Sequence, residues 1–138
     1  MRTFYIFKIN NEFAILTKDC PFNLYKTMEG IYYFNGSDLK PIYKMFKYIA
    51  NPFNKKNLNL KIFELHRHNL NYTKFNNIHM IHNYYTDEET ELTVKNVYLI
   101  LKSTIATPSF FNDLKDKENL FVCDFQNKDY FWLDQLLI

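Results

Sequence analysis

The stretch that decides the fold closes the chain: Leu120-Phe-Val-Cys-Asp-Phe-Gln-Asn-Lys-Asp-Tyr-Phe-Trp-Leu133. Its two ends are rich in apolar and aromatic residues, which is typical of β-strands. The polar residues between them suit a turn. The segment therefore predicts a strand, a turn and a second strand. Trp132, the only tryptophan of the chain, is expected in the core rather than in a ligand cradle.

The N-terminal residues predict a second pair of strands. Thr3–Ile9 is rich in β-branched and aromatic residues, and Glu12–Thr17 continues with a similar pattern. The dipeptide Asn10-Asn11 between them tolerates the positive φ of a two-residue hairpin turn. A hairpin is therefore expected, although a helix over Phe13–Lys18 also fits because residues four apart share one side of a helix.

Helix starts are marked by proline in a first turn and by a preceding residue that can cap. Pro21 follows Asp19-Cys20, and Gly30 is a plausible stop for that helix. Pro41 follows Ser37-Asp38 in the same way, and Asn51-Pro52 ends the second helix. The predicted helices cover residues 21–30, 39–50 and 109–117.

The middle of the chain has a weaker pattern. Asn54–Asn59 is polar and is expected to be a loop, whereas Leu60–Phe63 fits either a short strand or the start of a helix. Tyr72–Ile81 fits a helix. Asp87–Glu91 is interpreted as a solvated acidic turn that protects a strand edge, and a hairpin is expected over residues 92–101.

These elements together predict an α/β fold. We expect a single compact domain over residues 1–138, with a mixed β-sheet of hairpins and about three or four helices packed on it. A hydrophobic content of 47% excludes a disordered chain. The chain has only two glycines, which excludes the glycine-rich loops that bind phosphates in the common nucleotide-dependent enzymes.

Charge and hydropathy indicate a cytoplasmic protein. The net charge of +2 is too small to predict a nucleic-acid partner by itself. No apolar run reaches the roughly 20 residues of a membrane helix, and the N-terminus does not resemble a signal peptide. The two cysteines, Cys20 and Cys123, are too few for a disulfide framework.

The four histidines are the strongest candidates for metal chemistry. His66 and His68 are two apart, and His79 and His82 are three apart. Either spacing can place a pair on one side of a strand or helix, and two pairs could complete a zinc site. No cysteine or carboxylate is placed as a further ligand, so unligated surface histidines are the simpler interpretation. A small metal-binding domain is kept as an alternative function.

A second alternative is weak binding of single-stranded nucleic acid. Lysines and aromatics alternate in Tyr43-Lys-Met-Phe-Lys-Tyr48, and bases stack on aromatic rings. The low net charge argues against it. The chain has more aromatics than a small core needs, so some are expected at the surface, where clustered aromatics mark protein interfaces.

Several short sequence patterns follow one another along the chain in a characteristic order. An aromatic strand precedes Asn11-Glu12-Phe13-Ala14, and the later residues are Tyr48-Ile49, Pro52, His66-x-His68, Asp124-Phe125, Lys128, Tyr130 and Trp132-Leu133. In this order and spacing the chain resembles the sporulation inhibitor of replication family, the SirA-like proteins of Firmicutes.

The resemblance implies a small α/β protein that is not an enzyme and needs no cofactor. Such proteins bind the N-terminal domain of the replication initiator DnaA, and they hold off new rounds of replication as a cell commits to sporulation. The family's binding surface implies roles here for Phe13 and Tyr48. Two further positions depart from the family, because Thr17 replaces an aromatic residue and Met45 replaces a polar one. No direct nucleic-acid contact and no membrane are expected.

Overall fold

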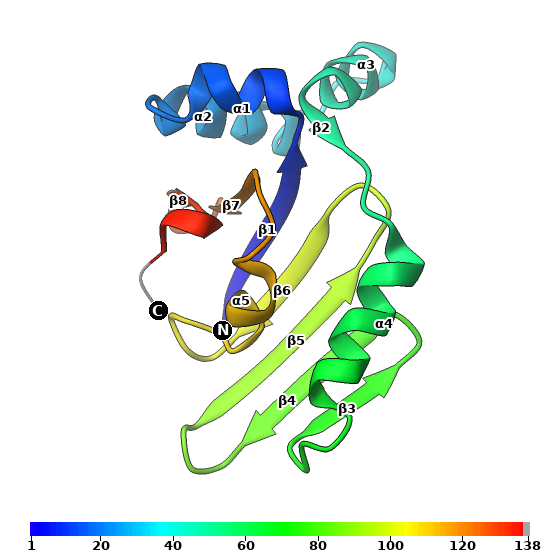
Figure 1. The fold of residues 1–138 in the computed structure, drawn as a ribbon. Helices are drawn as coiled ribbons and strands as arrows, with labels where there is room; N and C mark the ends of the chain where they lie inside the picture. The colour runs from blue at the N-terminus through cyan, green and yellow to red at the C-terminus, as the bar shows by residue number, and fades with distance from the viewer. Residues whose placement is uncertain (137–138) are drawn as a thin grey trace.

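An antiparallel β-sheet organises the protein in the computed structural model, which describes residues 1–136 (Figure 1). The eight strands found there are β1 (Arg2–Ile9), β2 (Ala50–Asn51), β3 (Tyr72–Phe75), β4 (Ile78–Asn83), β5 (Glu88–Val94), β6 (Leu99–Ser103), β7 (Leu120–Asp124) and β8 (Asp129–Trp132). Their order is β3-β4-β5-β6-β1-β7-β8, and β2 pairs with β1. Each of these neighbouring pairs is antiparallel.

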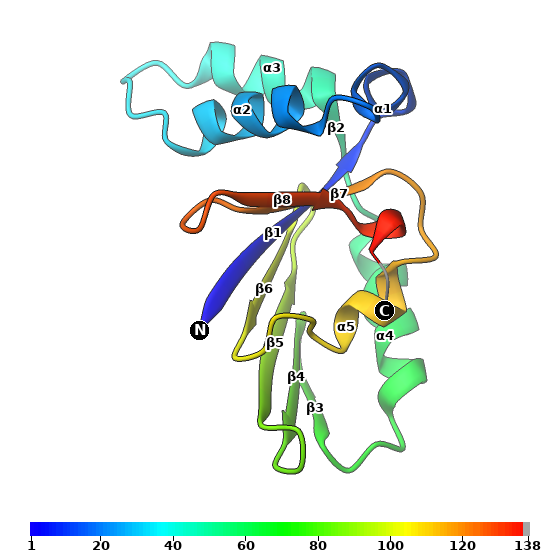
Figure 2. The ribbon, with the colours of Figure 1, turned by 90° about the vertical axis from the view of Figure 1, so that its left-hand side faces the viewer.

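Helices cover both faces of this sheet within residues 1–136. They are α1 (Asn11–Thr17), α2 (Pro21–Tyr32), α3 (Lys40–Ile49), α4 (Lys55–His66) and α5 (Phe110–Leu114), followed by a 3-10 turn, η1 (Leu133–Gln135). Helices α1, α2 and α3 form a layer beyond β1, β7 and β8, whereas α4 and α5 lie on the other side (Figure 2). None of the helices described is long and apolar enough to cross a bilayer.

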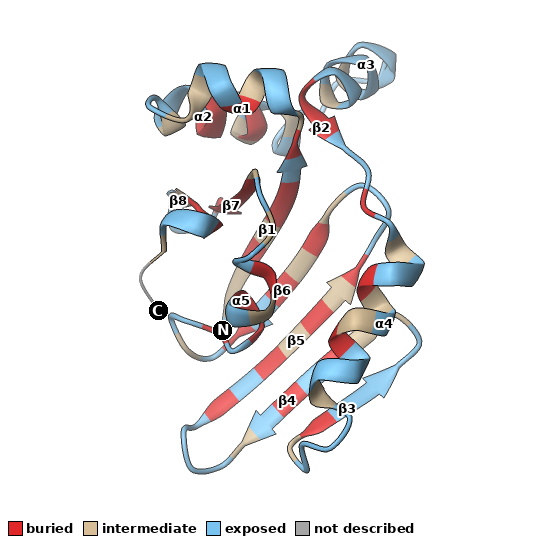
Figure 3. Cartoon of the chain, in the orientation of Figure 1, coloured by how far each residue is buried: buried red, intermediate tan, exposed pale blue. Residues whose placement is uncertain are grey.

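The central strands β1 and β7 are buried on both faces, because each contributes to two hydrophobic cores. Phe4 and Ile6 of β1 belong to the core beneath α4 and α5, whereas Phe7 and Ile9 belong to the core beneath α1 and α2. All five residues of β7 are buried, whereas buried residues alternate with less buried ones along β5 (Figure 3). Alternate side chains of a strand point to opposite faces, so the apolar run at 120–123 is explained by helices on both sides.

The predicted fold class is confirmed. The β7–β8 pair and the β5–β6 hairpin form as expected, and α2, α3 and α5 fall in the three predicted helical regions. The sheet is antiparallel rather than mixed, and five helices rather than three or four are found within residues 1–136. Gly30 does not end α2, which continues to Tyr32.

The predicted N-terminal hairpin is wrong, and the helical alternative is correct. Asn10 has extended backbone angles, with φ −65° and ψ 155°, so it does not form the expected turn. Its side-chain oxygen instead accepts a hydrogen bond from the Phe13 backbone N–H at 2.9 Å. That bond satisfies one of the free donors at a helix N-terminus, and α1 follows immediately.

The predictions for the middle of the chain are also wrong. Asn54–Asn59 is not a loop, because Asn54 caps α4 through the backbone N–H of Asn57 at 3.2 Å. Tyr72–Ile81 is not a helix but the β3–β4 hairpin. Its turn contains Asn76 at φ 54°, a conformation that asparagine tolerates better than most residues.

The predicted solvated turn over Asp87–Glu91 is wrong for all but its first residue. Asp87 ends the turn between β4 and β5, and the other four residues belong to β5, which lies inside the sheet rather than at its edge. Glu88 is only 3% exposed. Its carboxylate accepts hydrogen bonds from the Thr90 hydroxyl and from the backbone N–H and hydroxyl of Ser109. Thr90 also bonds Ser103 of β6 at 2.8 Å. The buried carboxylate therefore joins α5 to the sheet, which compensates for its desolvation.

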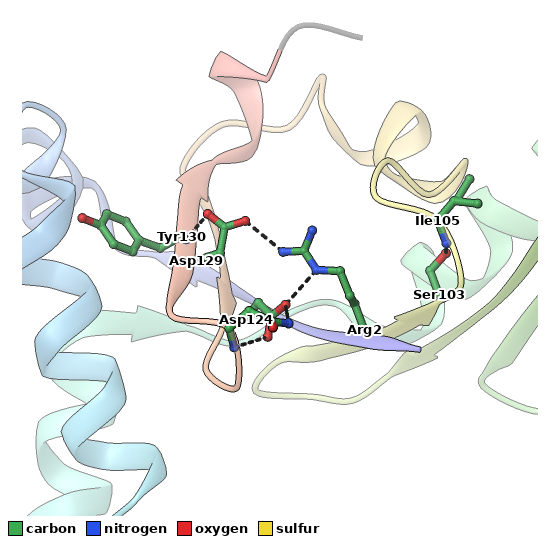
Figure 4. Close-up of polar contacts among 7 residues, drawn as sticks. Arg2, Ser103, Ile105, Asp124, Asp129 and Tyr130 are labelled. Atoms are coloured by element: carbon green, nitrogen blue, oxygen red, sulfur yellow. Dashed lines mark hydrogen bonds and ion pairs between the residues drawn. The ribbon is translucent and has the colours of Figure 1, made fainter.

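Two ion pairs join the two ends of the chain at the β7–β8 hairpin. The Arg2 guanidinium donates to Asp124 and Asp129, each at 2.9 Å (Figure 4). Asn127 also donates to Asp124 across the turn. Burial of Asp124 opposes its ionisation, but the bonds from Asn127 and Arg2 outweigh burial and hold its pKa below the ordinary value. Asp124 therefore stabilises the scaffold.

Candidate functional site

An aromatic pair at the junction of α1 and α3 is the candidate site. Phe13 of α1 and Tyr48 of α3 pack edge to face, with ring centroids 5.4 Å apart and an interplanar angle of 88°. This geometry is the favourable one for two aromatic rings. The structure thus brings together two residues that are 35 positions apart in the chain.

Asn10 holds the two helices together at this point. Its side-chain amide donates to the carbonyl of Tyr48, and its backbone N–H donates to the carbonyl of Ile49 at 2.8 Å. The same side chain caps α1. Immediately after α3, Ala50 pairs with Ile9 of β1. The backbones that carry the two rings are therefore held together at the ends of both helices, which limits the backbone entropy that a partner would have to remove.

The helices around the aromatic pair carry further exposed side chains. Tyr48 is 69% exposed and Phe13 is half-buried beside it. Thr17 is half-buried one turn further along α1 and donates its hydroxyl to the Phe13 carbonyl at 2.6 Å. Met45 is exposed one turn before Tyr48. The four predicted residues thus lie on two adjoining helices, although no contact between Thr17 and Met45 is seen.

The sequence interpretation missed one neighbour of these residues. Leu16 is 75% exposed and lies three residues after Phe13, on the adjoining side of α1. The signal was present, because the spacing of Phe13 and Leu16 is helical, but it was hidden by the assignment of a strand. Phe13, Leu16, Thr17, Met45 and Tyr48 are called the docking patch below. These residues carry no charge or nucleophile suited to catalysis and can form an apolar contact surface.

Two of the histidines have side-chain partners: His66, the half-buried last residue of α4, and His79, which is buried in β4. The His66 ring pairs with the Asp113 carboxylate. His79 is fully buried, with Nδ1 2.7 Å from the Tyr72 hydroxyl and Nε2 2.8 Å from Oδ1 of Asn59. Since the Asn59 oxygen can only accept, Nε2 donates to it and Nδ1 accepts from Tyr72. A neutral His79 satisfies both partners, so its role is structural.

The other two histidines do not complete a metal site. His68 lies beyond the end of α4, and the exposed ring of His82 packs on Tyr84 at 4.3 Å. Among residues 1–136, no group of three His, Cys, Asp or Glu side chains is placed to hold a metal ion. The two histidine pairs that the sequence suggested are therefore not assembled as ligands in the part of the chain described.

His79 leads to a prediction for the pH dependence of stability. Burial lowers its pKa from 6.5 to about 4, with smaller effects from Lys74 and His66. Between these pH values the unfolded chain binds a proton that the folded chain does not, so stability falls as pH decreases from 6.5 to 4. The expected loss is about 2–3 kcal/mol. Urea unfolding at several pH values measures it.

A His79→Gln variant is the control for this prediction, because glutamine can still donate to Asn59 but does not titrate. Its stability is expected to change much less than the wild-type stability between pH 6.5 and 4. Parallel curves for the two proteins would show that His79 is not the responsible group.

The comparison with known families bears on the whole chain. A family model described as sporulation inhibitor of replication protein SirA matches residues 2–136. No curated protein matches the chain. The family match includes both elements of the docking patch and the closing hairpin. The residues of that hairpin that carried the resemblance are structural: Asp124 bonds Arg2, and Tyr130 stacks on Tyr25 at 4.6 Å.

Proposed function

Because this chain belongs to the SirA family, the sporulation inhibitors of replication, we propose that it inhibits replication initiation by docking on the N-terminal domain of DnaA. It acts in the cytoplasm by occupying a surface of the initiator that productive assembly at the origin requires. The role needs no catalysis and no cofactor. The docking patch is the surface that meets DnaA.

The observation that carries this proposal is the aromatic pair formed by the exposed Tyr48 and the half-buried Phe13. Interfaces commonly depend on a few aromatic anchors surrounded by weaker contacts. Tyr48 is largely exposed, yet its backbone is tied to α1 through Asn10. A large exposed ring on a rigid support buries apolar area on binding at little entropic cost. Leu16 and Met45 extend the apolar surface to either side of the pair.

The departures at Thr17 and Met45 are compatible with the same mode of docking. Thr17 offers only a small side chain, and its hydroxyl already bonds the Phe13 carbonyl. Met45 is exposed and flexible, and methionine adapts to irregular apolar surfaces. The proposal therefore assigns most of the binding energy to the aromatic pair and an adaptable contact to Met45.

Isothermal titration of the full chain into the DnaA N-terminal domain from the same organism tests the proposal. We expect saturable one-to-one binding with a Kd of about 1 µM or lower. Affinity should fall only modestly between 50 and 300 mM salt, because an apolar patch releases few ions. Absence of binding at both salt concentrations would contradict the proposal.

The same salt series, with a single-stranded oligonucleotide in place of DnaA, addresses nucleic-acid binding. Contacts between phosphates and the lysines of α3 would produce an affinity that drops steeply with salt. The proposal expects no measurable oligonucleotide binding at 150 mM salt. Tight oligonucleotide binding with no DnaA binding would favour the nucleic-acid alternative.

A further inference from the structure

An apolar recess of about 280 Å³ lies between α2, α3, β1 and the turn that joins β5 to β6. Several of its walls are aromatic rings that pack on one another. The Phe7 ring centroid lies 5.9 Å from that of Phe46 and 6.2 Å from that of Tyr98. The recess is on the side of α3 that carries Ile42 and Phe46, whereas Met45 and Tyr48 of the docking patch do not line it.

The recess exists because α3 is packed closely at only one end. Ile42, Phe46 and Ile49 form the apolar stripe of this helix. Ile49 is 2% exposed and is followed by the β2 pairing, but Ile42 and Phe46 remain only half-buried. Helix α3 therefore packs on the sheet through Ile49 near its C-terminal end, while Ile42 and Phe46 face the recess. An apolar ligand would complete this burial.

The charged side chains beside the recess are positive. Within residues 1–136, Lys47 is the only Asp, Glu, Lys or Arg residue that lines the recess. Two further lysines and no acidic residue occur on α3, and Lys95 Nζ lies 5.6 Å from the centroid of the Tyr98 ring. No salt bridge to Lys47 occurs within the described chain. A negatively charged group is the complement of this rim.

Hydroxyl groups add polar contacts to the apolar walls. Tyr5 and Tyr32 both line the recess, with their hydroxyl oxygens 3.4 Å apart. Small-molecule sites typically combine apolar walls with a few such groups and start at about 300 Å³. The recess lies close to that lower limit, so the body of its ligand is no larger than a bicyclic ring or a branched aliphatic chain.

We propose that this recess binds a small carboxylic acid with an aromatic or branched aliphatic body. The body packs among Phe7, Phe46 and Tyr98, and the carboxylate faces Lys47. Charge complementarity selects an acid over a neutral molecule of the same shape. This site is separate from the docking patch and does not depend on the identity of the replication partner.

Indole-3-acetate is the probe for a test by NMR, with its neutral analogue indole-3-acetamide as the matched comparison. Titration of the 15N-labelled full chain should produce saturable shifts of amides around the recess, with a Kd of about 1 mM or lower for the acid. The acid should bind roughly three- to tenfold more tightly than the amide.

Variants of two lysines on α3 separate the role of Lys47 from general charge. Lys47→Gln should remove the preference for indole-3-acetate and leave the affinity for indole-3-acetamide unchanged. Lys44→Gln, at a position outside the recess, should retain the preference. A filling variant, Ile42→Trp, should abolish binding of both probes while leaving the amide spectrum of the sheet unchanged.

Each result decides the proposal. No saturable shifts at the recess, shifts dispersed over other surfaces, or equal affinity for the acid and the amide would overturn it. Equal weakening of indole-3-acetate binding by Lys44→Gln and Lys47→Gln would also overturn it, because the effect of charge would then be nonspecific. Loss of the acid preference in Lys47→Gln alone, together with blocked binding in a folded Ile42→Trp variant, supports it.

Discussion

Replacing Tyr48 with alanine is expected to weaken binding of the DnaA N-terminal domain at least about thirtyfold, which corresponds to roughly 2 kcal/mol. The ring is 69% exposed and packs on Phe13 at its edge. Its removal deletes the largest apolar contact of the docking patch. The fold should be retained, because Tyr48 contributes little to either core. Isothermal titration measures the affinity, and thermal unfolding checks the stability.

Tyr85→Ala is the matched control, because Tyr85 is 99% exposed in the turn between β4 and β5, outside the docking patch. It should bind DnaA as the wild-type chain does. Tyr48→Phe should retain most of the affinity if the ring, rather than the hydroxyl, makes the contact. Binding by Tyr48→Ala within twofold of the wild-type value would remove Tyr48 from the interface.

Coupling between the two rings can be measured by a double-mutant cycle. Phe13→Ala should also weaken binding, but the double variant should lose less than the sum of the two single losses. The expected coupling is about 0.5–1.5 kcal/mol, because each ring supports the position of the other. Fully additive losses would mean that Phe13 and Tyr48 contact the partner independently.

Replacing Trp132 with alanine is expected to lower the free energy of unfolding by about 3–5 kcal/mol. The side chain is 1% exposed and packs edge to face on Phe121 at 5.0 Å. The Lys18 ammonium lies 4.3 Å from the ring, which adds a cation–π contact. Urea unfolding followed by circular dichroism measures the loss, since the variant has no tryptophan fluorescence.

Trp132→Phe should cost much less than Trp132→Ala. The indole N–H has no hydrogen-bond partner within the described residues, so phenylalanine removes an unsatisfied donor while it keeps most of the ring volume. Phe75→Ala is the surface control, because Phe75 is 67% exposed on edge strand β3. Equal losses for Trp132→Ala and Phe75→Ala would contradict the core assignment.

The sequence was most informative where local signals and burial agree. The apolar run at 120–123 indicated a strand, and the structure buries it on both faces. Proline in the first turn located α2 and α3. The outward position of Met45 and Tyr48 also followed from the helical spacing of α3, because residues off the apolar stripe face away from the core.

The sequence predictions are wrong where the apolar residues of an element do not all lie on one of its faces. Helix α4 buries Leu58 and Ile62, but Leu60 and Leu65 are exposed on its other sides. The resulting pattern has no clear helical period, and its polar beginning resembles a loop. Glu88 was misassigned for a different reason, since its burial depends on bonds from Ser109, which is 21 residues away.

The dipeptide Asn-Asn shows most clearly what local sequence determines and what it leaves open. Asn10-Asn11 caps a helix, whereas Asn76-Asn77 forms the turn of a hairpin with Asn76 at φ 54°. Asparagine favours both conformations because its side chain can bond nearby backbone groups. At 10–11 the choice follows from the backbone of α3, whose carbonyls bond Asn10. The sequence thus specified β1, the β5–β6 and β7–β8 pairs, the helices α2, α3 and α5 and the outward residues of α3, while long-range contacts brought Phe13 beside Tyr48.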